Sequence, residues 1–348
     1  MPPKTSVTIC VVVVIAIMML YMLPDDTDHM TVLAHGRRKE AAPGSDCARF
    51  GLRALPTTRS SSALRPRIYD LIALWSEDDM LHIRMHELST VVDYFVIVEC
   101  DLTYSGVERS LFWPTLRNQT RFQPYLHQVV FHSVKAREDL GTHERQQNAL
   151  DSNIRMLLAE EPAEVRPRAG DVMLFTDCDE IPRADFLRQI KTCDQYSWES
   201  PAAMNMIMFN FNYRTSLGLV WNESKIFRVS PEMIREKLVS VQRFAKPRHL
   251  FVNAGWHCSY CFAHVSQFIR KIEAMAHAEY NVAHFKQRDR ILQRIRNAKD
   301  LFDYGVNFTL MQGPTEELDA PRCVRYPRQC GSTALYMSDV EEFTAKIY

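Results

Sequence analysis

The chain has 348 residues, 46% of them hydrophobic, which is enough for one large domain or two small ones. Its 42 acidic and 42 basic residues balance, so nothing in the composition favours a nucleic-acid partner. Nine cysteines fit an oxidising compartment, and three N-glycosylation sequons add support for the secretory lumen: Asn118-Gln-Thr120, Asn222-Glu-Ser224 and Asn307-Phe-Thr309.

The N-terminal segment predicts a membrane anchor. Residues 7–23 are apolar except for Thr8 and span roughly 25 Å as a helix. Lys4 precedes the segment and aspartates follow it, so the positive-inside rule assigns residues 1–6 to a cytoplasmic tail. A cleaved signal peptide is the alternative, but no small-x-small cleavage site follows the apolar run. We therefore expect a signal anchor and a luminal domain.

Two segments predict flexible regions on either side of that domain. Residues 24–67 mix Pro, Gly, Ser, Arg and Thr without apolar periodicity, which is typical of a stem. Cys47 lies in this stem and is available to link a second chain, as in a homodimer, to bond to the domain, or to remain a free thiol. Residues 312–348 predict a C-terminal tail whose Cys323 and Cys330 close a disulfide loop.

The region 68–311 predicts the folded domain. Apolar runs predict strands, and helical spacing of apolar residues predicts helices between them. Their alternation indicates an α/β fold with a mostly parallel sheet. Neither a G-x-G-x-x-G loop nor a Walker A loop is present, so nucleotide binding would depend on a metal. The predicted strands are 68–74, 94–99, 127–132 and 172–176; the predicted helices are 81–92 and 143–160.

The strand 172–176 runs directly into Asp177, Asp179 and Glu180. Open α/β sheets bind ligands at the carboxyl ends of their strands. Two carboxylates one residue apart suit Mg²⁺ or Mn²⁺ carrying a diphosphate, as a nucleotide-sugar transferase requires. An acidic surface turn is the alternative interpretation.

A second pair of carboxylates follows the strand 94–99. Glu99 and Asp101 are candidates for contact with the nucleotide or for a catalytic base, and the alternative for them is a turn cap.

Three later segments add further expectations. Residues 202–214 predict one long strand, and Pro231 suits the start of a short helix. Residues 268–302 predict a helix rich in lysine and arginine. That pattern indicates a solvated basic face, with Lys271 or an arginine as a candidate contact for a diphosphate.

The stretch 253–262 gathers Trp256, His257, Cys258 and Cys261. The two cysteines predict a disulfide; zinc binding with His257 and His264 is a cramped alternative. His257 is a candidate ligand of the divalent metal or the diphosphate, or a hydrogen-bonded core histidine. Trp256 is a candidate for stacking on a sugar or for filling the core.

Three motifs together resemble glycosyltransferase family 17: Asp93-Tyr-Phe-Val-Ile-Val-Glu99, Asp177-Cys-Asp-Glu-Ile-Pro182 and Gly255-Trp-His-Cys-Ser-Tyr-Cys-Phe262. Lys271 and His277 stand where the family also tends to have Lys and His. The resemblance covers the chain from about Ile68 to Phe302.

The resemblance implies a single-pass type II Golgi membrane protein with a GT-A-like catalytic domain. It implies an inverting transferase that moves N-acetylglucosamine from UDP-N-acetylglucosamine (UDP-GlcNAc) in β-1,4 linkage to the core mannose of N-glycans. On the family pattern Asp177 and Asp179 would hold Mn²⁺, or Mg²⁺, and the diphosphate. Candidate bases for the acceptor hydroxyl are Glu180, Asp185, Glu99 and Asp101, although Asp185 would also suit a helix cap.

Two alternatives to this function stay open at the level of sequence. The first is a membrane-anchored glycan-binding protein without turnover, in which Trp256 and other aromatic residues bind sugar. The second is the same fold acting on another UDP-sugar or another acceptor, because loop contacts decide the donor.

Overall fold

The computed structural model describes residues 47–54, 65–103, 105–135, 139–194, 197–236, 246–275 and 277–330. The predicted cytoplasmic tail (1–6), membrane anchor (7–23) and much of the stem lie outside these ranges, as do residues 331–348. In the described part of the chain, no helix is both long and apolar enough to cross a membrane.

The first half of the domain is a parallel α/β unit, as the sequence predicts. Strand order is β3-β2-β1-β4, and each neighbouring pair is parallel. Strand β3 begins two residues later than predicted because a 3₁₀ helix, Thr120–Gln128, precedes it. The elements are β1 (Ile68–Ala73), α2 (Asp78–Leu88), β2 (Tyr94–Cys100), α3 (Trp113–Leu116), β3 (Val129–Val134), α4 (Thr142–Ala159) and β4 (Val172–Asp177).

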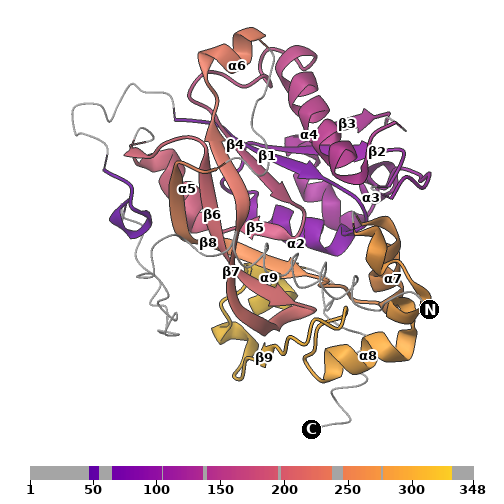
Figure 1. The fold of residues 1–348 in the computed structure, drawn as a ribbon. Coiled ribbons are helices and arrows are strands. Elements are labelled where there is room, and N and C mark those ends of the chain that lie inside the picture. The colour runs from indigo at the N-terminus through magenta and orange to yellow at the C-terminus, as the bar shows by residue number, and fades with distance from the viewer. Residues whose placement is uncertain are drawn as a thin grey trace. The chain divides into compact units, whose positions relative to one another are not determined.

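The second half changes the character of the sheet. The sheet continues from β4 through β7, β6 and β8 to β5 (Figure 1). The pairs β4–β7, β7–β6, β8–β5 and β7–β9 are antiparallel and β6–β8 is parallel, so the sheet is mixed, and the prediction of a mostly parallel sheet is wrong. The elements are β5 (Glu180–Pro182), α5 (Ala184–Thr192), β6 (Ala202–Asn210), β7 (Asn212–Arg228), α6 (Pro231–Glu236), β8 (His249–Ser259) and β9 (Thr309–Leu310).

The predicted long strand 202–214 is broken at one residue. Phe211 has a φ of 68° and lies between β6 and β7, which turn back on each other there. A positive φ interrupts extended backbone, and alternation of polar and apolar residues cannot reveal such a break. The short helix predicted at Pro231 is confirmed as α6.

The predicted basic helix 268–302 is also wrong as one element. It is divided into α7 (Val265–Ala274), two 3₁₀ turns (Ala278–Tyr280 and Ala283–Lys286) and α8 (Arg288–Arg296). Ile272 and Ile291 belong to one buried cluster with Phe268 and Ile295. One straight helix would separate Ile272 from Ile291 by roughly 28 Å, so the chain must reverse between them.

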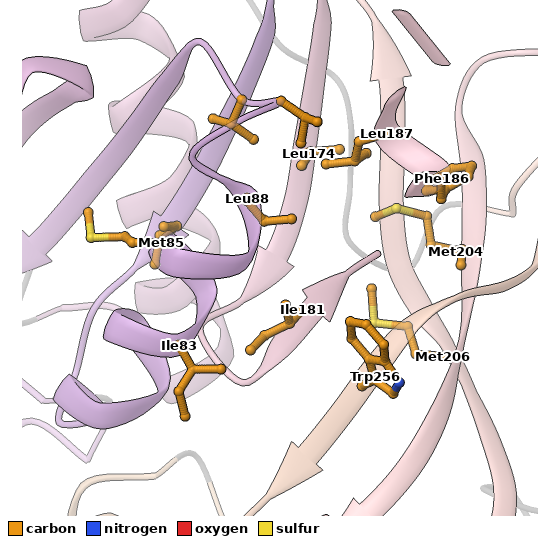
Figure 2. Packing of buried hydrophobic residues seen from close by; sticks show 14 of the residues in the cluster. Ile83, Met85, Leu88, Leu174, Ile181, Phe186, Leu187, Met204, Met206 and Trp256 are labelled. Atoms are coloured by element: carbon orange, nitrogen blue, oxygen red, sulfur yellow. The ribbon is translucent and has the colours of Figure 1, made fainter. Parts of the chain in front are cut away.

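Strands β1, β2 and β4 are buried on both faces. On one face α4 packs Leu150, Ile154 and Leu157 onto β1, β2 and β4. On the other face α2 and α5 meet the strands in the larger core, in which Met85, Leu174 and Phe186 take part (Figure 2). The site at the strand ends is therefore built on a rigid three-layer frame.

Parts of the predicted stem and tail belong to the domain. Residues 47–50 form a 3₁₀ helix that a Cys47–Cys193 disulfide joins to the end of α5. The ring centroids of Phe50 and Phe186 lie 5.2 Å apart. In the predicted tail the Cys323–Cys330 disulfide is confirmed, and α9 (Arg322–Arg325) packs on α2. Apolar residues on both sides of the predicted boundaries at 67 and 312, among them Phe50 and Val324, belong to the buried core.

Gly255 provides a test of how β8 is seated against β5. A Cβ atom there would lie 2.5 Å from the carbonyl oxygen of Ile181 and 3.0 Å from the Cα of Pro182, both backbone atoms. We expect Gly255→Ala to lower the free energy of unfolding by about 1–3 kcal/mol, as measured by chemical denaturation. Gly141→Ala is the control, since its Cβ would meet only the flexible Glu144 side chain, at 3.2 Å. Equal stability of the two variants would contradict this packing.

Candidate functional site

The site is the turn that links β4 to β5. Strand β4 ends at Asp177, opposite Ala73 of β1. The chain then turns through Asp179 into β5, where Glu180 pairs with His257 of β8. The carboxyl end of the parallel unit is thereby joined to the antiparallel half, which brings Asp177, Asp179 and His257 to one region.

A buried arginine fixes the backbone of this turn. Arg84 of α2 is 0% exposed, and its guanidinium donates two hydrogen bonds to the Asp70 carboxylate, at 2.7 and 2.5 Å. It also donates to the carbonyl oxygens of Asp177, at 2.8 Å, and Glu180, at 2.7 Å. The apolar spacing that predicts helix α2 does not reveal this role, because Arg84 lies between the apolar residues of that pattern.

Glu180 braces the same turn from inside. One carboxylate oxygen accepts a hydrogen bond from the Trp221 indole, at 2.7 Å. The other accepts from the Ser224 hydroxyl at 2.8 Å and from the backbone N–H of Asp177 at 3.0 Å. Glu180 is buried, and these donors hold its carboxylate within the fold.

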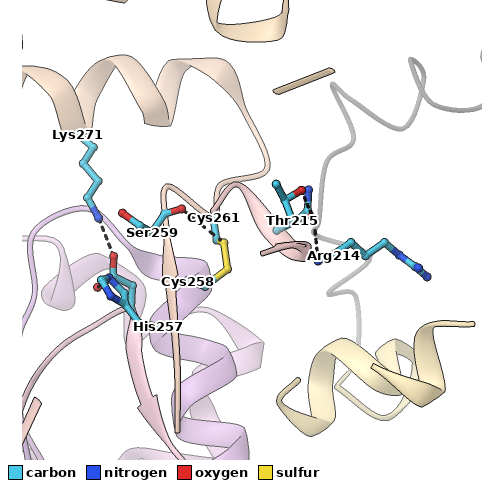
Figure 3. The surroundings of a disulfide bond; sticks show 9 residues. Arg214, Thr215, His257, Cys258, Ser259, Cys261 and Lys271 are labelled. Carbon is cyan, nitrogen blue, oxygen red and sulfur yellow. Dashed lines mark hydrogen bonds and ion pairs between the residues drawn. A yellow bond between two sulfur atoms is a disulfide. The ribbon is translucent and has the colours of Figure 1, made fainter. Parts of the chain in front are cut away.

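Asp179 lies in a cluster of charged side chains. Its Oδ2 accepts a hydrogen bond of 2.8 Å from the ammonium of Lys271, which extends from α7 (Figure 3). The same ammonium lies 3.3 Å from Glu77. Burial alone would raise the pKa of Asp179, but Lys271 and His257 hold that pKa below its usual value. Burial would lower the pKa of Lys271, and the carboxylates of Asp179 and Glu77 raise it instead, so the pair stays charged.

His257 faces the other oxygen of Asp179. Its Nε2 lies 3.8 Å from Asp179 Oδ1, beyond hydrogen-bond distance, and its buried Nδ1 has no hydrogen-bond partner among the residues that the structure describes. Two ligand atoms 3.8 Å apart can lie on either side of one cation with bonds of about 2.1 Å. The chemistry of these residues therefore fits a divalent metal.

The three predicted metal ligands, Asp177, Asp179 and His257, do not have their ligand atoms close together as a group. Within the described ranges, one group of three such side chains has its ligand atoms within 4.8 Å of one another: His86, Cys323 and Cys330. Its two sulfur atoms are bonded to each other, so it is no metal site. A metal between Asp179 and His257 would therefore need its other ligands from Asp177, water or a bound diphosphate.

The two tryptophans near the site have different roles. Trp256 is 2% exposed, lies in the core (Figure 2), and donates its indole N–H to Asp319 at 3.1 Å. Of the two roles considered for Trp256, the structure supports core filling. Trp221 of β7, which sequence reasoning missed, is half-buried, and its ring centroid lies 4.9 Å from that of His257.

The remaining candidate bases have other partners. Glu99 accepts hydrogen bonds from the backbone N–H groups of Phe112 at 2.7 Å and Trp113 at 2.5 Å, and it pairs with Arg109. This is the turn-cap role, and burial raises the pKa of Glu99 despite those donors. Asp185 lies in the first turn of α5 and pairs with Arg49 at 3.0 Å.

Asp101 follows β2, and its backbone carbonyl accepts a hydrogen bond of 2.8 Å from the backbone N–H of Arg109.

The cysteines of the β8 motif are bonded to each other. The Cys258–Cys261 disulfide confirms the prediction and makes the zinc alternative wrong, because both sulfur atoms are used (Figure 3). The disulfide lies between His257 on β8 and the helix that carries Lys271. Cys178, between the two aspartates, is a buried free thiol whose pKa burial raises.

Comparison with known proteins gives relatives of one kind. The chain is 27% identical over 243 residues to the β-1,4-mannosyl-glycoprotein 4-β-N-acetylglucosaminyltransferases of rat and human. Each alignment covers 60% of this chain and 43% of the relative, so the match spans less than half the length of those enzymes.

A solved mannosyltransferase of Pyrobaculum calidifontis, in complex with GDP-mannose and Mn²⁺, aligns with 67% of this chain and 69% of its own. Its sequence identity is 13% and its TM-score is 0.33, too low for the likeness to bear on the site.

The family model of glycosyltransferase family 17 matches residues 5–308, most of the chain. This chain therefore belongs to glycosyltransferase family 17.

Proposed function

We propose that this chain is an inverting glycosyltransferase with a GT-A-like domain. Its donor is UDP-GlcNAc, and the acceptor is the core β-mannose of N-glycans, joined in β-1,4 linkage. The proposal rests on the Asp177–Asp179 turn at the end of β4 in a chain of family 17. Arg84 holds the backbone of this turn by a hydrogen bond, and His257 faces Asp179. The names of the rat and human relatives support this choice of sugar and linkage.

In this proposal the residues of the turn and their neighbours have different roles. Asp177 and Asp179, with His257, would hold Mn²⁺ or Mg²⁺, and a bound cation would neutralise charge on the departing UDP. Arg84 and Glu180 hold the turn in place, so the aspartates do not have to be ordered at the moment of reaction. Lys271 adds a positive charge close to where the diphosphate would bind.

The proposed chemistry is a single in-line displacement. A mannose hydroxyl oxygen forms a bond to the anomeric carbon while the bond from that carbon to UDP breaks on the opposite face. The hydroxyl proton passes to a base. The candidates for that base are Glu180, Asp185, Glu99 and Asp101, of which Glu180 and Glu99 accept buried hydrogen bonds and Asp185 pairs with Arg49.

The proposed setting is the Golgi lumen, with the chain anchored as a single-pass type II membrane protein through residues 7–23. The described residues offer two supports for a luminal domain. All three sequon asparagines, Asn118, Asn222 and Asn307, are exposed. Three disulfides join Cys47 to Cys193, Cys258 to Cys261 and Cys323 to Cys330, as suits an oxidising compartment.

Substitution of the turn aspartates tests the proposed metal site. We expect Asp177→Asn and Asp179→Asn each to lower sugar transfer at least about 100-fold, because cation and diphosphate lose a charged ligand. Transfer from UDP-GlcNAc to a biantennary N-glycan is measured by product mass, with and without a chelator. Asp289→Asn, in the exposed first turn of α8, is the matched control. Full activity of either turn variant, or activity that survives chelation, would end the metal assignment.

Trp221 provides a test of the sugar-binding surface. Its indole borders His257 and is fixed by Glu180, so it is positioned to contact a sugar ring. We expect Trp221→Ala to lower kcat/KM about 10–100-fold and Trp221→Phe to lower it less, since phenylalanine keeps an aromatic face. Steady-state kinetics in donor and in acceptor identify which sugar is affected. Tyr304→Ala, at an exposed aromatic residue, is the control. Wild-type kinetics for Trp221→Ala would exclude this contact.

A further inference from the structure

Lys271 is a charged side chain set deep in the domain beside the proposed cation site. Its side chain is 18% exposed, and its ammonium lies between Asp179, at 2.8 Å, and Glu77, at 3.3 Å. Above it lie the rings of Tyr260, at 5.3 Å from the ammonium, and Phe262, at 5.6 Å. Two carboxylates and two aromatic rings therefore surround a site that suits a cation, and the ammonium of Lys271 occupies this site.

The position of the ammonium makes it a rival of a metal ion. Lys271 occupies Oδ2 of Asp179, while Oδ1 of the same carboxylate faces His257 at 3.8 Å. A divalent cation on Oδ1 would lie roughly 5 Å from the ammonium, given bonds of about 2.1 Å to oxygen. At that separation two positive charges repel each other strongly, even at an effective dielectric constant of about 20.

We propose that Lys271 is an internal competitor for the divalent cation. In the metal-free protein its single positive charge offsets part of the negative charge of Asp179 and Glu77, and it thereby weakens the binding of a free cation to the turn. This inference rests on the proposed function, because it takes the cation to bind at Asp179.

The Lys271 ammonium also affects the order in which metal and nucleotide bind. A diphosphate brings negative charge that attracts both the cation and the ammonium, so the repulsion between the two is relieved when the diphosphate is present. The lysine thus favours the metal–nucleotide complex over the bare metal. A site without the lysine would take up the bare metal readily and would lose this selection.

Direct metal binding tests the proposal without any assay of activity. Mn²⁺ alone is titrated into the full-length protein, and the free ion is measured by electron paramagnetic resonance. We expect Lys271→Met to bind Mn²⁺ about tenfold more tightly than the wild type, since the repelling charge is gone. Lys271→Arg keeps the charge and is expected to bind like the wild type. Lys286→Met is the control, since Lys286 pairs with Glu273 and Asn281 at the surface.

A second variant covers the case in which Lys271→Met does not fold. Glu77→Gln removes one of the two carboxylates and leaves the ammonium to Asp179 alone. We expect it to bind Mn²⁺ more weakly than the wild type, so the two substitutions move the affinity in opposite directions. Melting curves of each variant establish that it is folded.

The outcomes separate this inference from the proposed function. If the wild type binds Mn²⁺ and folded Lys271→Met binds it no more tightly, the inference is overturned while the metal site stands. If neither protein binds Mn²⁺ even with UDP present, both the inference and the metal assignment fail. Tighter binding by Lys271→Met together with weaker binding by Glu77→Gln would establish the competition.

Discussion

The buried ion pair of Arg84 and Asp70 is the interaction on which the site depends. Both side chains are fully buried, and the pair joins helix α2 to strand β1. Removing one partner of such a pair typically costs about 3–5 kcal/mol, because the other charge is left uncompensated. The pair is satisfied here because the same guanidinium also binds the carbonyl oxygens of the acidic turn. Helix, strand and turn are therefore fixed by one side chain.

The hydrogen bonds from Arg84 help to explain how an acidic turn can be largely buried. Asp177, Asp179 and Glu180 would repel one another if all three faced one point. The fold separates their tasks: Glu180 turns inward to the donors of β7, and Asp179 turns to Lys271 and His257. Strands β7 and β8 supply Trp221, Ser224 and His257, and helix α7 supplies Lys271, so the second half of the domain completes the site.

The sequence predicted the parallel half of the fold and the place of the acidic turn, because apolar runs that end in charged residues are strong local signals. It did not predict Arg84 as the residue that fixes the turn, since its partners lie 14 to 96 positions away. Strand β8 was missed because polar and apolar residues mix at its start. Successive side chains of a strand point to opposite faces of the sheet. Once β8 is known, this alternation places Trp256 on the core side and His257 on the side of the site. Trp221 has no local signal, because only the pairing of β7 brings it to His257.

Sugar transfer from a panel of donors is the most direct test of the proposed function. The full-length chain is incubated with Mn²⁺, a biantennary N-glycan and a panel of UDP- and GDP-sugars, and the products are identified by mass. We expect the N-glycan to gain one N-acetylhexosamine from UDP-GlcNAc, and we expect this gain to be lost on chelation. Release of UDP from that donor without a product would keep the enzyme and overturn the acceptor. No turnover of any donor by folded protein would contradict the account and favour a glycan-binding protein.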